Sequence, residues 1–493
     1  MLRSMREHRG FFLATALAAL ALRLLFFVYF PAVTDDSRVY ADLAGNWLQH
    51  GIYGQTQSAP SVTQIVPTDT RLPGYPAFLA AVFWLFGVGN FKAVLLTQIL
   101  LDLATCIMVA DLARRVVSER AARITLVLAA LCPFLANYAA AVLTETLEIF
   151  FTALALDCAA AALHRMNEMQ SGRSPLPLWA ATGAAIAACI LLRPDGGILL
   201  AAVVFYLALA ALGISTELCS SLCSSQRPPF LRFGGAAIMI AVLALAPLAP
   251  WTIRNFRTLH HFQPLAPRYA NESDEAVPRG FIRWVKTWIV DYASVEEIYW
   301  NVPGEQLDPR RLPSRAFENA AERDKTLALI ADYNQSGEMT LQLDMRFGDL
   351  ASDRIHAHTL RYYFVLPMLR VADMWLRPRT EILPPDVRWW EFNDDLKQSL
   401  LAVGFGLLNL AYVATALSAV ILKPSRQQSE IRWAGFLLAF LLLRSIFLAT
   451  LENPEPRYTL ECYPAIIVLA SARLARETGR VWRYGAPLPP NKP

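Results

Sequence analysis

The sequence has few charged residues. Asp, Glu, Lys and Arg make up 17% of the 493 positions, whereas 55% of the positions are hydrophobic. Soluble globular domains average about 25% charged residues, so this composition excludes an ordinary soluble protein. The mean hydropathy is +0.34, and apolar runs of about 20 residues recur along the chain, which predicts a polytopic helical membrane protein. The net charge of +4 gives no indication of nucleic acid binding.

The chain also lacks a disulfide framework, a nucleotide-binding loop and a metal-ligand cluster. Its seven cysteines are odd in number, and five of them lie in or beside apolar runs. Cys219 and Cys223 stand in a short polar loop without the further ligands that a zinc site needs. No phosphate-cradling glycine loop occurs, so neither ATP nor a sugar nucleotide is indicated as a ligand. We therefore expect no cofactor, although a divalent metal is not excluded.

Basic residues in short loops predict the orientation in the membrane. Three arginines precede the apolar run 11–30, which is too long for a signal peptide, has no cleavage site and is expected to be the first span. Counting on from this span gives about ten transmembrane helices in an all-α polytopic fold. We expect the protein to lie in a bacterial plasma membrane, with both termini on the cytoplasmic side. The run 75–88 is too short to cross and is expected to be re-entrant or juxtamembrane. We expect four parts: a membrane core at 1–253 with a first outer loop at 31–76, a mostly helical outer-face subdomain at 254–397, further transmembrane helices at 398–475, and a cytoplasmic tail at 476–493.

The first outer loop carries two adjacent carboxylates, Asp35 and Asp36, where the chain leaves the first span. Asp36, Tyr40 and Ala44 follow at a spacing of four residues, which places them on one face of a helix. One of the two aspartates is expected to cap the helix. The loop returns to the membrane at Arg71, so an acid and an arginine lie at the two ends of one loop near one membrane face.

Further polar residues gather at the same predicted face. They are Tyr75, Glu145, Arg193, Arg254, Arg457 and Tyr458. A charge at the end of a span can be an ordinary interfacial anchor. Several arginines on the outer face are less expected, because positive charge is normally retained inside, and they favour an anionic ligand such as a lipid phosphate.

An acid beside a phosphate site suggests group transfer. The carboxylate would take the proton of an attacking hydroxyl, and the arginines would stabilise the charge that develops on a departing phosphate. The alternative reading is that Asp35 and Asp36 only cap a surface helix.

In its motifs the chain resembles the GT-C membrane glycosyltransferases, specifically the branch of the aminoarabinose transferases and protein O-mannosyltransferases. The motifs are D-x-x-x-Y-x-x-x-A at 36–44, H-G-x-Y-G at 50–54, R-x-P-G-Y-P at 71–76, L-T-E at 143–145, L-R-P-D-G at 192–196, P-W-x-x-R-N at 250–255 and P-R-Y at 456–458. No single motif is specific for this family. The order of the motifs in the chain and their predicted location at one membrane face make the set specific.

The resemblance implies a GT-C-like bundle and inverting transfer of a hexose or pentose from a polyprenyl-phosphate donor to a lipid, protein or polysaccharide acceptor. Asp36 matches the expected general base, and Arg71 matches the basic residue that contacts the donor phosphate. Asp35 is a possible second acid, because the usual Asp-Glu pair is Asp36-Ser37 here. The competing hypotheses are a transporter or flippase for a lipid-linked or anionic solute, although no internal repeat is visible, and a non-catalytic partner in envelope assembly.

Overall fold

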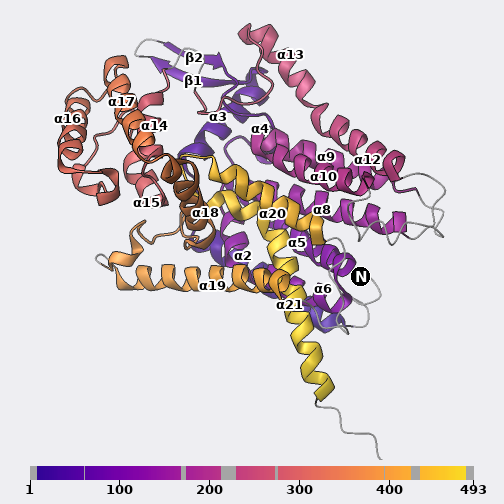
Figure 1. The fold of residues 1–493 in the computed structure, drawn as a ribbon. Coiled ribbons are helices and arrows are strands. Elements are labelled where there is room, and N and C mark those ends of the chain that lie inside the picture. Colours follow the sequence, from indigo (N-terminus) through magenta and orange to yellow (C-terminus); the bar gives the residue numbers. More distant parts are fainter. Residues whose placement is uncertain are drawn as a thin grey trace, which may run out of the picture. The chain divides into compact units, whose positions relative to one another are not determined.

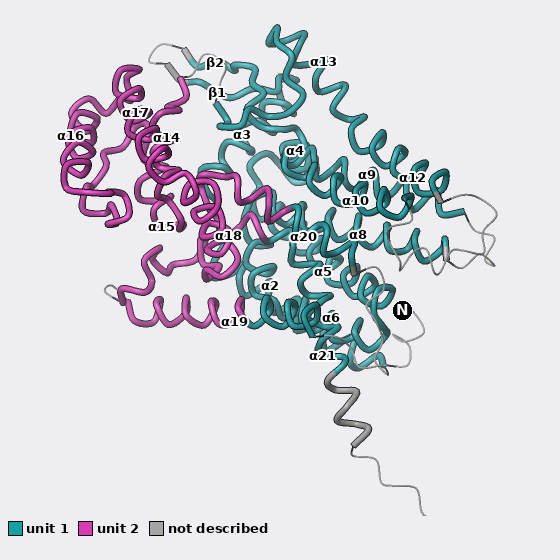
Figure 2. The backbone as a smooth tube through the Cα atoms, viewed as in Figure 1, with its two compact units in different colours: residues 1–272, 411–443, 460–493 teal, residues 273–410, 444–459 magenta. Residues whose placement is uncertain are grey.

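The computed structural model describes residues 8–59, 62–167, 174–212, 229–271, 276–392, 395–422 and 434–484. Cys219, Cys223 and the expected tail beyond residue 484 lie outside these ranges. The chain divides into two compact units, coloured in Figure 2. Unit 1 consists of residues 1–272, 411–443 and 460–493, and unit 2 consists of 273–410 and 444–459.

Unit 1 contains most of the apolar helices. Figure 1 labels the elements of the chain. In chain order the elements of unit 1 are α2 (Arg9–Tyr29), α3 (Asp35–His50), β1 (Gly54–Ala59), β2 (Val62–Pro67), α4 (Gly74–Phe86), α5 (Phe91–Val116), α6 (Glu119–Ala130), α7 (Pro133–Ala139), α8 (Glu145–Asn167), α9 (Leu176–Leu192), η1 (Pro194–Gly196), α10 (Gly197–Ala211), α12 (Pro229–Leu245), α13 (Leu248–Leu259) and α21 (Tyr463–Tyr484). Helices α19 (Leu396–Ile421) and α20 (Ala434–Ala449), like η7 (Pro456–Cys462), contribute residues to both units.

Helix α8 lies at the centre of the unit 1 bundle. It packs against α5 on one side and α9 on another, and 72% of its apolar window is buried, against 17% for α2. A helix that is apolar all round is expected in such a position. The two carboxylates in its first turn, Glu145 and Glu148, are therefore held at a helix N-terminus inside the protein, where the helix dipole favours negative charge.

A buried ion pair stabilises a broken helix in unit 1. Helices α6 and α7 meet at a bend of 52°, because Pro133 cannot continue the backbone hydrogen bonds of α6. The carbonyls of Ala129 and Ala130 accept hydrogen bonds from the Arg23 guanidinium of α2 instead. Asp102 of α5 neutralises that guanidinium at 2.7 Å, and both side chains are almost fully buried. Asp102 thus has a structural role that its sequence neighbourhood does not indicate.

Unit 2 is built from shorter helices. They are α14 (Arg279–Lys286), α15 (Tyr292–Ser294), the π-helix η2 (Val295–Tyr299), η3 (Pro309–Arg311), η4 (Ser314–Ala316), α16 (Ala320–Ser336), α17 (Leu341–Ala357), the π-helix η5 (Arg361–Val365), α18 (Leu366–Leu376) and η6 (Trp389–Glu391). Its core is aromatic: Trp284 meets Trp288 edge-to-face and Phe347 at a tilt, at 5.4 and 5.2 Å between ring centroids. Arg370 is fully buried and donates to the carbonyls of Lys286, Ile289 and Leu451.

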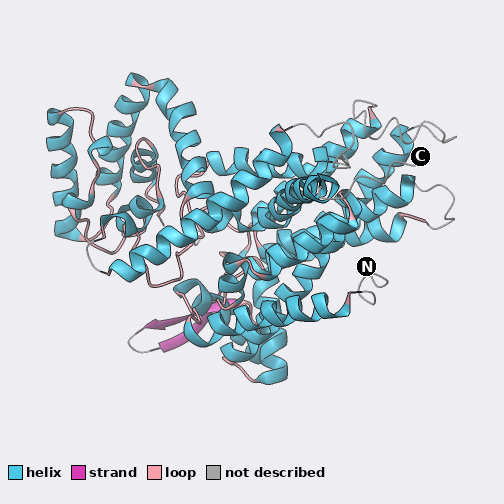
Figure 3. Cartoon of the chain, turned by 90° about the horizontal axis from the view of Figure 1, so that it is seen from below, coloured by secondary structure: helices cyan, strands magenta, loops and turns pink. Residues whose placement is uncertain are grey.

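The predicted all-α polytopic membrane fold is confirmed. Six helices are long and apolar enough to cross a bilayer, or seven if the bent α6–α7 pair counts as one span, and three shorter apolar helices accompany them among the described residues. The count of ten crossings stays a prediction. One element was not predicted: β1 and β2 form an antiparallel hairpin within residues 31–76 (Figure 3), and Gly54 pairs with Pro67.

Candidate functional site

Helix α3 begins where the chain leaves α2, and its first turn holds the two aspartates. Thr34, rather than either aspartate, is the N-cap: its hydroxyl accepts from the Ser37 N–H, and the Ser37 hydroxyl accepts from the Thr34 N–H. The prediction that one of the two aspartates caps this helix was therefore wrong. Asp35 is 97% exposed and pairs with Arg38 at 2.9 Å, whereas Asp36 is 35% exposed. The two acids thus have different surroundings one residue apart.

Asp36 contacts Arg71 across the loop. The Arg71 Nη2 lies 3.0 Å from the Asp36 Oδ1. The Arg71 backbone is fixed because the Tyr53 hydroxyl donates to the carbonyls of Arg71 and Leu72, at 2.9 and 3.2 Å. Burial lowers the pKa of Arg71, but the neighbouring Tyr40 and Asp36 raise it, and the net direction is upward. The guanidinium therefore remains positively charged at a half-buried position.

Tyr40 lies among the charges of this cluster. Its ring meets Tyr75 edge-to-face at 5.1 Å, and the Arg71 guanidinium lies 5.9 Å from the ring centroid. Burial raises the pKa of Tyr40 to about 12, while the charges of Arg71 and Arg193 lower it and those of Asp36 and Glu145 raise it. The charges of four predicted site residues thus act on the Tyr40 hydroxyl.

Tyr75 belongs to the same packing. Its hydroxyl donates to the Gln98 Oε1 at 2.7 Å, and the Gln98 amide donates to the Ala141 carbonyl at 2.6 Å. Gly74 permits this arrangement, because a Cβ at that position would lie 2.5 Å from the Leu191 carbonyl oxygen. The R-x-P-G-Y-P motif thus brings the start of α4 against the end of α9.

Arg193 is surrounded by carboxylates. It lies 3.7 Å from Glu145, 3.3 Å from Glu148 and 3.2 Å from Asp195. Three carboxylates therefore share this guanidinium. In this structure, the guanidinium that the sequence assigned to an anionic ligand is occupied by protein carboxylates.

Arg254 of α13 contacts the loop at residues 31–76. Its guanidinium donates to the carbonyls of Tyr53 and Thr68, and it lies over the rings of Tyr53 and Trp251, at 5.3 and 5.2 Å from their centroids. Its contacts therefore hold the backbone on both sides of the hairpin, from which Arg71 follows.

Two residues of this region were missed by the sequence analysis. Asp69 is buried and lies 2.7 Å from the His261 Nε2. No local signal connects them, because 192 positions separate them in the chain. The pair fixes the loop two residues before Arg71.

The remaining two candidates belong to unit 2. Arg457 pairs with Glu455 at 2.6 Å, and the Tyr458 hydroxyl donates to the same carboxylate. Within the described ranges, no three His, Cys, Asp or Glu side chains converge as metal ligands.

A family model described as dolichyl-phosphate-mannose-protein mannosyltransferase matches residues 68–224. This segment begins at the end of the hairpin and includes Arg71, Tyr75, Glu145 and Arg193. The match confirms the resemblance to GT-C glycosyltransferases that the motifs indicated. No curated protein sequence matches the chain.

Two solved structures from one archaeal organism share the fold. The Archaeoglobus fulgidus oligosaccharyltransferase tethered with an acceptor peptide has a TM-score of 0.53 at 12% identity, over 97% of this chain and 50% of that chain. The AglB enzyme of the same organism, in complex with an inhibitory peptide and a dolichol-phosphate, gives 0.50 at 12% identity, over 99% and 53%. Apo ArnT from Cupriavidus metallidurans gives 0.39 at 15% identity, over 95% and 77%.

The present chain spans about half the length of the oligosaccharyltransferase that it matches. At 12% identity this likeness shows the fold. The chain is a multi-pass membrane protein with a GT-C fold.

Proposed function

We propose that this protein is an inverting glycosyltransferase that moves a hexose or pentose from a polyprenyl-phosphate carrier to an acceptor hydroxyl, at the outer face of a bacterial plasma membrane. The observation that carries the proposal is the Asp36–Arg71 pair, a half-exposed carboxylate 3.0 Å from a half-buried guanidinium. A lipid-phosphate donor is supported by the name of the matching family model and by the dolichol-phosphate bound to an archaeal protein of the same fold.

The reaction needs one base and one phosphate site. An oxygen of the acceptor hydroxyl attacks the anomeric carbon, the bond from that carbon to the phosphate oxygen breaks, and the hydroxyl proton passes to Asp36. The polyprenyl phosphate leaves with the bonding electron pair, and Arg71 stabilises its charge with forked donors. When the donor phosphate binds Arg71, it replaces Asp36 there and leaves the carboxylate available to the acceptor.

The other polar residues support these two. The charges of Glu145 and Arg193 act on the Tyr40 hydroxyl, and Arg254 holds the loop from which Arg71 projects. Asp35 has no share in the reaction in this proposal, because it is exposed and paired with Arg38.

The test is sugar transfer by purified, lipid-reconstituted protein offered radiolabelled polyprenyl-phosphate sugars. Asp36→Asn should lower kcat by about 10²–10⁴-fold, the range that positioned acid–base groups contribute. Arg71→Ala should lower kcat/KM for the donor, whereas Asp35→Asn should stay within about threefold of wild type, since it removes only an exposed pair. Equal losses in Asp35→Asn and Asp36→Asn would refute the assignment of the base.

The transporter hypothesis predicts a different result. If no donor is turned over, but labelled lipid crosses the bilayer equally well with wild type and Asp36→Asn, the protein moves the lipid and does not transfer its sugar. If Asp36→Asn changes neither turnover nor lipid movement, a role in assembly takes precedence.

A further inference from the structure

Unit 2 contains a cavity of about 330 Å³ between η2 and the loop that follows α18. This volume is at the lower end of the range for small-molecule sites. Its floor is formed by buried residues: the Tyr292 ring, the Arg377 guanidinium and Thr380. A floor with an aromatic ring and polar groups suits a ligand that has both an apolar face and a polar edge.

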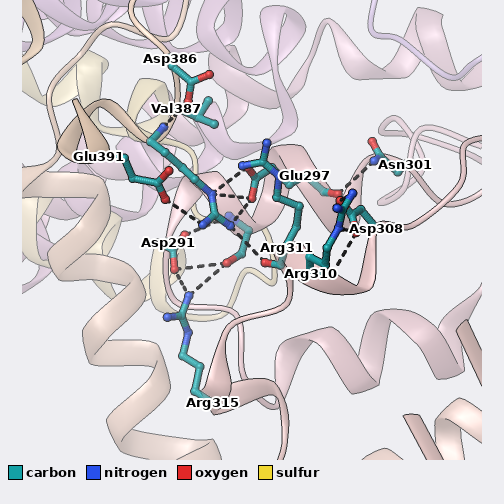
Figure 4. Close-up of polar contacts among 12 residues, drawn as sticks. Asp291, Glu297, Asn301, Asp308, Arg310, Arg311, Arg315, Asp386, Val387 and Glu391 are labelled. Atoms are coloured by element: carbon teal, nitrogen blue, oxygen red, sulfur yellow. Dashed lines mark hydrogen bonds and ion pairs between the residues drawn. The ribbon is translucent and has the colours of Figure 1, made fainter. Parts of the chain in front are cut away.

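The wall of the cavity is held by a network of ion pairs. Glu297 accepts two nearly parallel hydrogen bonds from Arg388, at 2.8 Å (Nε to Oε1) and 2.6 Å (Nη2 to Oε2), and it also pairs with Arg311 at 3.2 Å. Figure 4 shows Glu297 and Arg311 in this network, together with Glu391, to which Arg388 donates at 3.2 Å. Such forked pairs fix side-chain geometry, so the cavity is preorganised.

The positive charge in the floor is already matched. Arg377 pairs with Asp373 at 3.6 Å, donates to the Val387 carbonyl, and lies 5.6 Å from the Tyr292 ring centroid. Asn409 holds its backbone by donating to the Arg377 carbonyl at 3.1 Å. Arg377 therefore serves the structure of the floor and leaves little net positive charge for a ligand.

Two exposed carboxylates lie at the rim of the cavity. They are Glu296 and Asp386, and they line it together with Glu297, which two arginines neutralise. Carboxylates only accept hydrogen bonds, and like charges repel. The cavity therefore disfavours a phosphate or another anion, and it favours a ligand with many hydroxyl or amino donors.

Trp389 extends this surface. It lines both the main cavity and a second hollow of about 150 Å³, and Asp386 is shared in the same way. Its indole N–H is buried and has no acceptor among the described residues. A buried donor without an acceptor costs about 1–3 kcal/mol, which an oxygen atom of a ligand would offset after a small movement of the side chain.

We propose that this cavity binds a sugar ring of the acceptor, one that is neutral or carries an amino group. A sugar ring presents C–H groups on its face, which fit Tyr292 and Trp389, and donors along its edge, which fit Glu296 and Asp386. The assignment to the acceptor rests on the proposed function, in which the donor carries a phosphate that this acidic lining would repel. The acceptor is then a glycan or glycolipid.

The experiment measures binding of three methyl glycosides to the full-length protein in detergent, with saturation-transfer-difference NMR as the readout. The probes are a neutral hexoside, a 2-amino-2-deoxyhexoside and a hexuronide. We expect saturable binding of the first two and at least tenfold weaker binding of the hexuronide. Glu296→Gln should raise the Kd for the amino sugar about tenfold, because it removes a charge-assisted hydrogen bond. Trp389→Phe, which keeps an aromatic ring, should weaken binding of the hexoside.

Asp332→Asn is the matched control, because Asp332 is an exposed carboxylate of the same unit that pairs with Arg346 and does not line the cavity. Binding that is absent, equal for the hexuronide, or unchanged in both Glu296→Gln and Trp389→Phe would overturn the site. If the glycosides bind at this site but no donor sugar is transferred, the proposed function and the acceptor assignment fail while the sugar site stands.

Discussion

At the scale of single residues, neighbouring carboxylates differ because of what they contact. Asp35 and Asp36 are adjacent, yet one is exposed beside Arg38 and the other faces Arg71 and Tyr40. The motif resemblance favoured Asp36 as the base, but it could not show which partner each aspartate contacts. Helix periodicity fixes only the angle between two side chains and not the partner that a distant loop supplies. Arg71 is 35 positions away from Asp36, and its approach depends on the hairpin between them.

A buried carboxylate in unit 2 gives a prediction about pH. Burial raises the pKa of Asp373 from its ordinary 3.8 to about 6, although Arg377 opposes the shift. The unfolded chain therefore releases this proton first, and the folded protein holds more protons between about pH 4 and 6. The contribution of this carboxyl to the free energy of unfolding is therefore largest below about pH 4. It falls by about 3 kcal/mol as the pH rises from about 4 to about 6, and it stays at the lower value above pH 6.

Asp373→Asn should remove this dependence while keeping an acceptor for the Tyr292 N–H. Thermal unfolding followed by tryptophan fluorescence, at steps from pH 4 to 7.5, should show the Tm of the variant rising relative to wild type as pH increases. A constant difference in Tm across this range would contradict the pKa assignment. Asp332→Asn, at an exposed ion pair, should show no such trend.

At the scale of elements, the packing of α6 and α7 depends on a charge pair from two other helices. Removing one partner leaves a buried charge alone, which typically costs about 3–5 kcal/mol. The single changes Arg23→Met and Asp102→Leu should therefore each destabilise the protein strongly, since each leaves a buried charge without its counterion. The double change Arg23→Met with Asp102→Leu should recover part of that loss, because no charge then remains buried. Unfolding of the four proteins of this cycle in detergent measures the coupling; additive losses would show that the pair acts through other contacts.

Glycine at the start of α4 is a second test at this scale. A Cβ on Gly74 would lie 2.5 Å from the Leu191 carbonyl oxygen, so Gly74→Ala should push α4 away from α9, cost about 1–3 kcal/mol and displace Tyr75 and Arg71. Gly197→Ala is the control, because a Cβ at Gly197 meets nothing within 4 Å. We expect lower Tm and lower sugar transfer only in Gly74→Ala. Equal effects in the two variants would mean that the close approach is not what the glycine provides.

These elements also show what the sequence could predict. Long apolar helices are encoded in the local sequence, so the membrane fold was predictable from the apolar runs alone. The β1–β2 hairpin was not, because its strands lie in a loop whose polar residues suggested only a connection between helices. The role of Asp102 was equally hidden, because Arg23 lies 79 positions away and the carbonyls that it contacts are freed only by the break at Pro133. The pairing of Asp69 with His261 depends in the same way on the folded loop.

At the scale of the whole molecule, the orientation in the membrane decides where the proposed reaction occurs. The distribution of arginines predicts that the loop between α2 and α4 faces outward and that the turn between α5 and α6 faces the cytoplasm. Two exposed positions report on these sides: Gln57 in the hairpin and Glu119 at the start of α6. Cysteine labelling can test them, because the five described native cysteines are buried and Cys219 and Cys223 can be changed to serine.

In spheroplasts, a membrane-impermeant maleimide should label Gln57→Cys directly and Glu119→Cys only after permeabilisation. The expectation follows from the charge asymmetry, since moving the arginines that follow α5 across the bilayer would cost several kcal/mol each. Labelling in the opposite order would place the Asp36–Arg71 pair on the cytoplasmic face. The acceptor would then have to be a cytoplasmic molecule, even if the chemistry of the pair were unchanged. Sugar transfer measured on the same cysteine variants would show that the labelled proteins are folded, so the orientation and the activity are read from one preparation.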